Sequence, residues 1–222
     1  MANDISNPFN SPDIKSPLDD NWAAKRNVSA ALRRLIENLV TCTTDTDTLN
    51  NMAVQLNEQA DALEQAPRLH GRMAFEEAED ISSHAHLGYE LNPLDGKSNP
   101  IAAPIIVWVD ADRVYGKVTM GWQYEGPPKA VHGGFVAALF DQFLGVGQKI
   151  TEQPGFTGTL TIKYLQPTPI DTELRLEGWV DRVDGRKNYM VGEMWAGDVK
   201  TASCEGVFIS ITPQMYRRMQ NL

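Results

Sequence analysis

Residues 126–147 read GPPKAVHGGFVAALFDQFLGVG, and this stretch decides the fold. It opens on a Gly-Pro-Pro loop, passes a His-Gly-Gly sequence at 132–134, and continues as an apolar run interrupted by Asp141 and Gln142. The run has the length of a helix, and apolar residues lie nearly all round it. A helix without a wide polar face has to be buried on most of its sides. The sequence therefore predicts a helix enclosed by other elements.

The chain on both sides of this helix alternates with a period of two, the pattern of half-buried strands. The expected strands are 105–109, 114–122, 157–166, 171–183, 187–196 and 199–211. Asp184-Gly185 and Gly197-Asp198 favour tight hairpin turns. We expect the four later strands to follow one another as an antiparallel meander, without the repeated helices of a doubly wound sheet. An antiparallel sheet wrapped around one buried helix is the hotdog fold, of the α+β class.

An N-terminal helical extension precedes this domain. Apolar residues recur there at three- and four-residue spacing, which predicts two helices, the second beginning near a capping residue at Thr46 or Asp47. Such a pair cannot bury its own apolar stripes, so we expect it to pack on another domain or a partner chain. The predicted segments are a flexible tail at 1–20, the helical pair at 21–66, an irregular connector at 67–104, the hotdog domain at 105–213 and a C-terminal tail at 214–222.

The length, net charge and cysteine content of the chain limit the possible classes of function. The chain has 222 residues and a net charge of −9, which argues against a general nucleic-acid binder. No apolar run is long enough for a membrane span, and the N-terminus lacks the pattern of a secretory signal. Cys42 and Cys204 lie far apart and match no metal or redox spacing, so we expect no metal site and a reducing, cytoplasmic compartment.

The central stretch holds the candidate chemistry. An ionised carboxylate in a buried helix is costly, which makes Asp141 a site candidate; alternatively, it faces a solvent gap or a subunit surface. Gly133 and Gly134 expose N–H groups at a helix N-terminus, where an oxyanion is stabilised, although glycines there also permit a tight turn. For His132, a capping role is favoured over acid–base catalysis.

Helix geometry separates two of these groups. Gly133 and Asp141 are eight residues apart, which corresponds to about 12 Å along a helix. Groups that act on one carbonyl have to approach within roughly 3–3.5 Å of it. If both act on a single substrate, the helix N-terminus of one subunit faces Asp141 of another, and the site predicts an obligate dimer.

HGGFVAALFD at 132–141, followed by GTLTIKYLQPTPI at 158–170 and a GRK turn at 185–187, resembles the hotdog-fold acyl-CoA thioesterases. The resemblance is greatest to the phenylacetate-pathway and human mitochondrial branch, and it covers about 100–212. It implies hydrolysis of an acyl-CoA thioester to a free acid and CoA, without a metal or organic cofactor. It also implies a homo-oligomer, either a dimer or a dimer of dimers.

The resemblance assigns catalytic roles residue by residue. Asp141 matches the carboxylate that acts as general base or nucleophile, and Gly133 matches the residue whose N–H polarises the thioester carbonyl. His132 shapes that loop, and Thr157 falls where the family places a hydroxyl that positions the attacking group. Phenylacetate-type members often carry an Asn six positions before the histidine, whereas Gly126 stands here, so water positioning by that Asn is not implied.

A second set of residues is implied to bind the substrate. The Gly134 N–H lies beside the carbonyl-binding position, and the residues matching the CoA groove are Lys163, Arg186, Lys187, Asn188 and Tyr189. A basic cluster around one hairpin turn suits the phosphates of CoA in a protein that is acidic overall. Charges that keep a hairpin turn soluble are the ordinary alternative.

Two other functions remain open from the sequence. A non-catalytic acyl-CoA- or lipid-binding hotdog protein would keep the fold and the basic turn and make Asp141 incidental. A hotdog enoyl-CoA hydratase uses a D-x-N-P-x-H loop, and the nearest string here, ELNPLD at 90–95, lacks the histidine. The acyl group is not readable, because the helix residues that could line a tunnel also serve the core.

Overall fold

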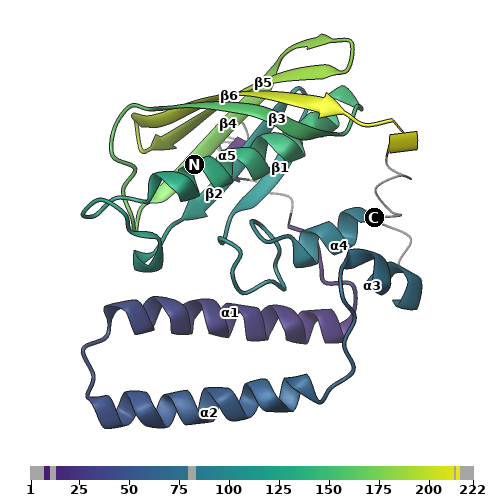
Figure 1. Cartoon of the computed structure of the whole chain (residues 1–222). Coiled ribbons are helices and arrows are strands. Elements are labelled where there is room, and N and C mark those ends of the chain that lie inside the picture. Colours follow the sequence, from purple (N-terminus) through teal and green to yellow (C-terminus); the bar gives the residue numbers. More distant parts are fainter. Residues whose placement is uncertain (1–7, 11–13, 80–83, 213, 216–222) are drawn as a thin grey trace, which may run out of the picture. The chain divides into compact units, whose positions relative to one another are not determined.

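The structure, a computed structural model, describes residues 8–10, 14–79, 84–212 and 214–215. The chain forms two compact units, and Figure 1 shows the elements of both. The first unit comprises Met1–Ser16, Pro93–Asp95 and Ile101–Leu222, and it holds the sheet and its central helix. The second comprises Pro17–Asn92 and Gly96–Pro100, and it is helical.

The first unit is built on one antiparallel sheet of six strands in the order β1-β2-β4-β5-β6-β3. The strands are β1 Ile106–Asp110, β2 Arg113–Thr119, β3 Gly155–Tyr164, β4 Glu173–Asp184, β5 Lys187–Ala196 and β6 Val199–Ser210. Both predicted hairpin turns are present, and in each the glycine, Gly185 or Gly197, has a positive φ. Short 3-10 turns lie at Pro8–Asn10, Trp122–Tyr124 and Gln148–Thr151.

The prediction of one meander after the helix is wrong for β3. Strands β4, β5 and β6 do form a meander, but β3 pairs with β6 at the sheet edge. Strand β3 cannot pair with β4, because β2 and β5 already occupy the two sides of β4. The link at 165–172 therefore carries the chain back across the sheet.

Helix α5, Gly133–Gly147, packs on one face of the sheet and confirms the predicted hotdog fold. Its buried residues are Val136, Leu139, Phe140, Phe143, Leu144 and Gly147. Gly178 and Gly192 pair across β4 and β5 directly beneath two of the helix phenylalanines. A Cβ at Gly178 would come within 2.9 Å of the Phe143 ring, so the glycine permits this close approach.

The burial of α5 is less complete than predicted. Its sheet-facing side is enclosed, whereas Phe135 is exposed and Asp141 is half-buried within the chain. The opposite side of the helix is thus only partly covered by the residues that the structure describes.

Part of the predicted tail is ordered against the sheet. The Phe9 ring lies edge-on to Trp108 and Tyr115, with centroids 5.9 and 5.3 Å apart, and the Arg175 guanidinium stands over it. Residues 1–7, 11–13 and most of the predicted C-terminal tail, 216–222, lie outside the described residues.

The second unit contains α1 Asp20–Thr41, α2 Thr46–Glu64, α3 Arg72–Glu79 and α4 His84–Leu91. The last two helices fall in the stretch predicted to be irregular, and each has only eight residues, which is too short for a clear apolar spacing. The N-cap of α2 is Asp45, which accepts from the Thr48 N–H at 2.9 Å, and neither Thr46 nor Asp47 serves as the cap.

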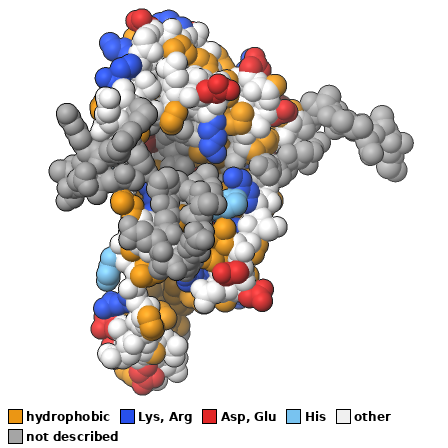
Figure 2. All heavy atoms as spheres, turned by 90° about the vertical axis from the view of Figure 1, so that its right-hand side faces the viewer, with side chains coloured by type: hydrophobic (Ala, Val, Ile, Leu, Met, Phe, Trp, Pro, Cys, Tyr) orange, Lys and Arg blue, Asp and Glu red, His pale blue; other side chains and the backbone are white. Residues whose placement is uncertain are grey.

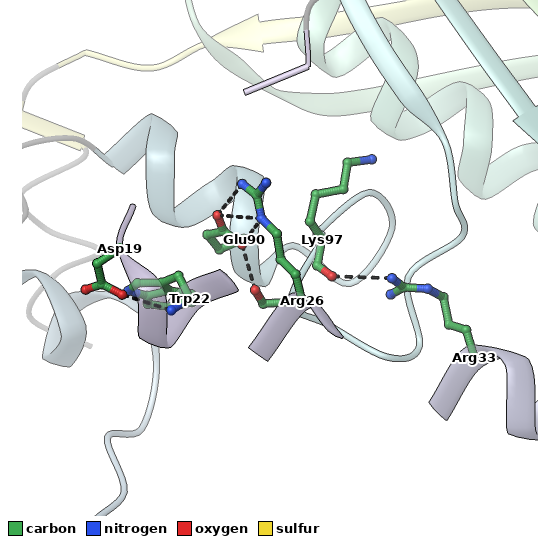
Figure 3. A network of polar contacts seen from close by, with 7 residues as sticks. Asp19, Trp22, Arg26, Arg33, Glu90 and Lys97 are labelled. Carbon is green, nitrogen blue, oxygen red and sulfur yellow. Dashed lines mark hydrogen bonds and ion pairs between the residues drawn. The ribbon is translucent and has the colours of Figure 1, made fainter. Parts of the chain in front are cut away.

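An ion pair ties α1 to α4 inside this unit, as Figure 3 shows. The Arg26 guanidinium donates to both Glu90 carboxylate oxygens, and the Ser98 hydroxyl donates to one of them. Glu90 is 1% exposed, so removing the Arg26 charge would leave a buried carboxylate without the cation that neutralises it. The guanidinium of Arg33, also on α1, donates hydrogen bonds to the carbonyls of Lys97 and Asn99.

Helix α2 buries none of its residues, and its Val54, Leu56 and Leu63 side chains are exposed. Figure 2 shows one face of the molecule, where hydrophobic side chains stand among charged ones of both signs. Among the described helices, none combines the length and the hydropathy needed to cross a membrane.

Candidate active site

The loop before α5 is shaped around His132. The His132 N–H donates to the Tyr124 carbonyl at 2.8 Å, and its Nδ1 accepts from the Gly134 N–H at 3.0 Å. The side chain therefore caps the helix. Gly126 packs against it so closely that a Cβ there would lie 2.7 Å from the His132 Cα. This loop consequently has no room for a side chain at position 126.

The first residue of α5 presents a free donor. The Gly133 N–H has no hydrogen-bond acceptor among the described residues, and it lies at the positive end of the helix dipole. The Gly133 carbonyl, in contrast, accepts from the Tyr164 hydroxyl at 3.0 Å. This end of the helix is therefore suited to bind a carbonyl oxygen that develops negative charge.

Asp141 lies two turns further along and meets β3. The Thr157 hydroxyl donates to its Oδ1 at 2.6 Å, so the structure brings together these two sequence-predicted residues. The bond engages one carboxylate oxygen and orients the group. Thr157 itself stands on the exposed edge strand, next to a bulge between Thr157 and Thr159.

A buried thiol lies within the electrostatic influence of this carboxylate. Burial, and then the negative charges of Asp141 and Glu205, raises the pKa of the Cys204 thiol from 9.0 to about 12. Cys204 is 1% exposed and lies on the helix-facing side of β6. It is therefore a neutral group at physiological pH.

We expect Cys204 to make folding sensitive to alkaline pH. The pKa is higher in the folded chain than in the unfolded chain, so the stabilising contribution is complete below about pH 9 and is lost as the pH rises toward about 12. The free energy of unfolding should fall by about 1 kcal/mol per pH unit in this window because of this group.

Urea unfolding at a series of pH values between these limits measures the effect. Cys204→Ala should flatten the slope, while Cys42→Ala, at an exposed position, should leave it unchanged. Equal slopes in the two variants would show that the Cys204 thiol is not the responsible group.

None of the hydrogen bonds and ion pairs found among the described residues joins a predicted CoA-binding residue to Asp141. Lys163 is exposed and pairs with Glu205 at 3.5 Å, and Lys187 is exposed at the β4–β5 turn. The Arg186 guanidinium donates to the Ser210 carbonyl at 2.8 and 3.0 Å. The Arg182 guanidinium stacks on the Tyr189 ring, with its central carbon 3.6 Å from the centroid of that ring.

Asn188, predicted to line the CoA groove, lies in the core of the domain. Its side chain is 0% exposed and donates to the Gln153 carbonyl at 2.8 Å, so within the chain it faces the core. The reason is the strand period: Asn188 shares a face of β5 with Met190 and Met194, which belong to the core.

A hollow of about 410 Å³ lies over β3, β4, β5 and β6. Arg182 and Tyr189 line it together with Thr159, Thr161 and Glu205. Neither Gly133 nor Asp141 is among its lining residues, so it is separate from the candidate catalytic groups.

Sequence reasoning missed Tyr164, which contacts the start of α5. Tyr164 ends β3, immediately before the Leu-Gln-Pro sequence, and nothing in its local pattern marks a contact with position 133. The alternating pattern of the sequence does place Tyr164 and Thr157 on the same strand, the one that follows the helix.

The comparisons with known proteins agree with this fold. The family model described as the thioesterase superfamily matches residues 129–203. Acyl-coenzyme A thioesterase THEM4 of Xenopus laevis is 29% identical over 91 residues, which are 40% of this chain and 41% of that protein. Acyl-coenzyme A thioesterase THEM5 of Homo sapiens is 29% identical over 93 residues, which are 41% of this chain and 38% of that protein.

The match therefore spans about two fifths of the length of these curated relatives. A crystal structure of a thioesterase superfamily protein is similar over most of the chain. It has a TM-score of 0.73 at 31% identity and covers 88% of this chain and 97% of that one.

Proposed function

Because this chain belongs to the thioesterase superfamily, we propose that it hydrolyses an acyl-CoA thioester to a carboxylic acid and free CoA. The oxygen of water is added to the acyl carbon, the carbon–sulfur bond breaks, and the CoA sulfur receives a proton. The observation that carries the proposal is the Thr157–Asp141 hydrogen bond on a helix that begins with the free Gly133 N–H.

The proposed roles fall to residues at the start of α5 and near its middle. The Gly133 N–H binds the thioester oxygen and stabilises the charge that develops on it. Asp141 either takes a proton from the attacking water or attacks the carbonyl itself. Thr157 orients the carboxylate through Oδ1, and His132 fixes the loop that presents the glycines, including Gly134.

We further propose that each site uses two subunits. Edge strand β3 contacts α5 near both of the strand's own ends. The Thr157 hydroxyl donates to Asp141, and the Tyr164 hydroxyl donates to the Gly133 carbonyl. The outer edge of β3 has no strand partner in the described chain. Antiparallel pairing of β3 with a second copy would set the Tyr164 end of one subunit beside the Thr157 end of the other. The two separated groups would then face one substrate.

The charges of CoA suit the exposed cations on the sheet. Lys163 and Lys187 are both accessible, and Tyr189 adds an aromatic surface. In the proposed complex these side chains contact the nucleotide end of CoA, whose phosphates attract cations. Arg186 contributes less, because its guanidinium already holds the end of β6.

Release of free CoA is the direct test. The purified protein is incubated with acyl-CoAs of increasing chain length and with aromatic acyl-CoAs, and the thiol released is measured over time. We expect catalytic release with at least one acyl class. Tight binding of CoA esters without release over the whole panel would contradict the proposal and favour a binding protein. Hydration of an enoyl-CoA without CoA release would contradict it in favour of a hydratase.

A further inference from the structure

Both ends of the Gly133–Gly134 peptide group are held by side chains. The Tyr164 hydroxyl donates to the Gly133 carbonyl at 3.0 Å, and the Gly134 N–H donates to His132 Nδ1 at 3.0 Å. That carbonyl and that N–H belong to one peptide plane. The three groups therefore form a continuous chain from hydroxyl to imidazole, in which each hydrogen bond polarises the next.

This series of hydrogen bonds determines which ring nitrogen of His132 carries the proton. Because Nδ1 accepts a hydrogen bond, the proton of the neutral ring lies on Nε2. The His132 side chain is exposed, and its Nε2–H is bonded to no group in the described residues. The loop before α5 thus carries a second donor in addition to the Gly133 N–H.

We infer that Tyr164 is a positioning residue of the candidate site. Acting through the Gly133–Gly134 peptide, its hydroxyl sets the orientation of the first helical turn and the tautomer of His132. The effect on hydrolysis rests on the proposed function, whereas the effect on the peptide and the imidazole does not.

The packing of Tyr164 does not explain this contact. Its side chain is 57% exposed on the edge strand, so ring burial contributes little to stability. The hydroxyl nevertheless points back to the helix, and the ring lies 3.4 Å from the place where a Gly133 Cβ would stand. The hydroxyl is thus the specific part of the residue, and phenylalanine would keep the ring while removing the bond.

The test is Tyr164→Phe, with Tyr115→Phe as the matched control. Tyr115 stands on β2 against Phe9 and Trp108, away from the start of α5. Imidazole ¹⁵N–¹H correlation spectra report the His132 tautomer, and amide hydrogen exchange reports the Gly134 N–H. In Tyr164→Phe we expect a population with the proton on Nδ1 and faster exchange of that amide. The control should match the wild type.

Steady-state kinetics test the consequence for catalysis. Losing one hydrogen bond should lower kcat about fivefold in Tyr164→Phe while KM changes little. A variant with unchanged tautomer and unchanged amide exchange would overturn the inference, whether or not the protein hydrolyses acyl-CoA. Absence of hydrolysis in the wild type would contradict the proposed function, and the spectra would still decide the role of Tyr164.

Discussion

Asp141→Asn is expected to lower acyl-CoA hydrolysis by at least about 100-fold in kcat, the range of a lost acid–base group. Asparagine has nearly the same shape, and its carbonyl oxygen still accepts from the Thr157 hydroxyl. It can neither take a proton from water nor attack the acyl carbon. The variant therefore removes the chemistry and keeps the contact that orients the group. CoA release under saturating substrate is the measurement.

The matched control for this variant is Asp198→Asn. Asp198 lies in the exposed turn between β5 and β6, so the same change of charge occurs away from α5. Wild-type rates are expected for the control. If Asp141→Asn hydrolysed the substrate at the wild-type rate, Asp141 would be a structural residue and another group would have to activate the water.

The second large effect is expected for Gly133→Pro, which removes the one N–H that is proposed to bind the carbonyl oxygen. Proline is well tolerated at the first position of a helix. His132 has φ −58° and ψ 133°, a conformation that a following proline permits. The fold should therefore persist while kcat falls about 100- to 1,000-fold, as for other lost oxyanion donors.

Gly133→Ala is the control for Gly133→Pro, because alanine adds a Cβ and keeps the N–H. The added carbon would meet the Tyr164 ring at 3.4 Å, an ordinary contact distance. Activity near the wild type in Gly133→Ala together with a large loss in Gly133→Pro would isolate the effect of the donor. Equal losses in both would point to steric disturbance of the turn.

The two inactive variants also test whether the site crosses subunits. In a mixed dimer of Asp141→Asn and Gly133→Pro chains, one site would combine the intact glycine of one chain with the intact carboxylate of the other. Random mixing should then restore about one quarter of the wild-type activity, since half the dimers are mixed and each has one intact site. Complete inactivity of co-expressed, isolated mixed dimers would contradict a shared site.

Much of the fold could be predicted because its signals are local. The apolar run after His132 and the period-two strands are visible in the sequence, and they correspond to α5 and the sheet. The place of β3 beside β6 was not predictable from adjacency in the chain, since it depends on which sheet edge is vacant. The helix cap of α2 and the short helices α3 and α4 of the second unit have only weak signals in the sequence.

Part of the candidate site was predictable from the resemblance, because it assigned residues on two different elements. Thr157 and Asp141 were named from the sequence, and the structure brings them into contact. Asn188 was assigned by resemblance alone, although the period of β5 already placed it on the core face. Tyr164 could not be found, because its contact arises where the end of one element meets the start of another.

The close packing of Gly126 on His132 has a consequence for how this loop can change in evolution. A side chain at position 126 would meet the His132 backbone at 2.7 Å, so an asparagine there does not fit the present loop. Position 126 and the backbone of the loop therefore have to change together, because a larger residue becomes acceptable only after the backbone around it has moved. A single substitution at position 126 would thus disturb the residue that caps α5.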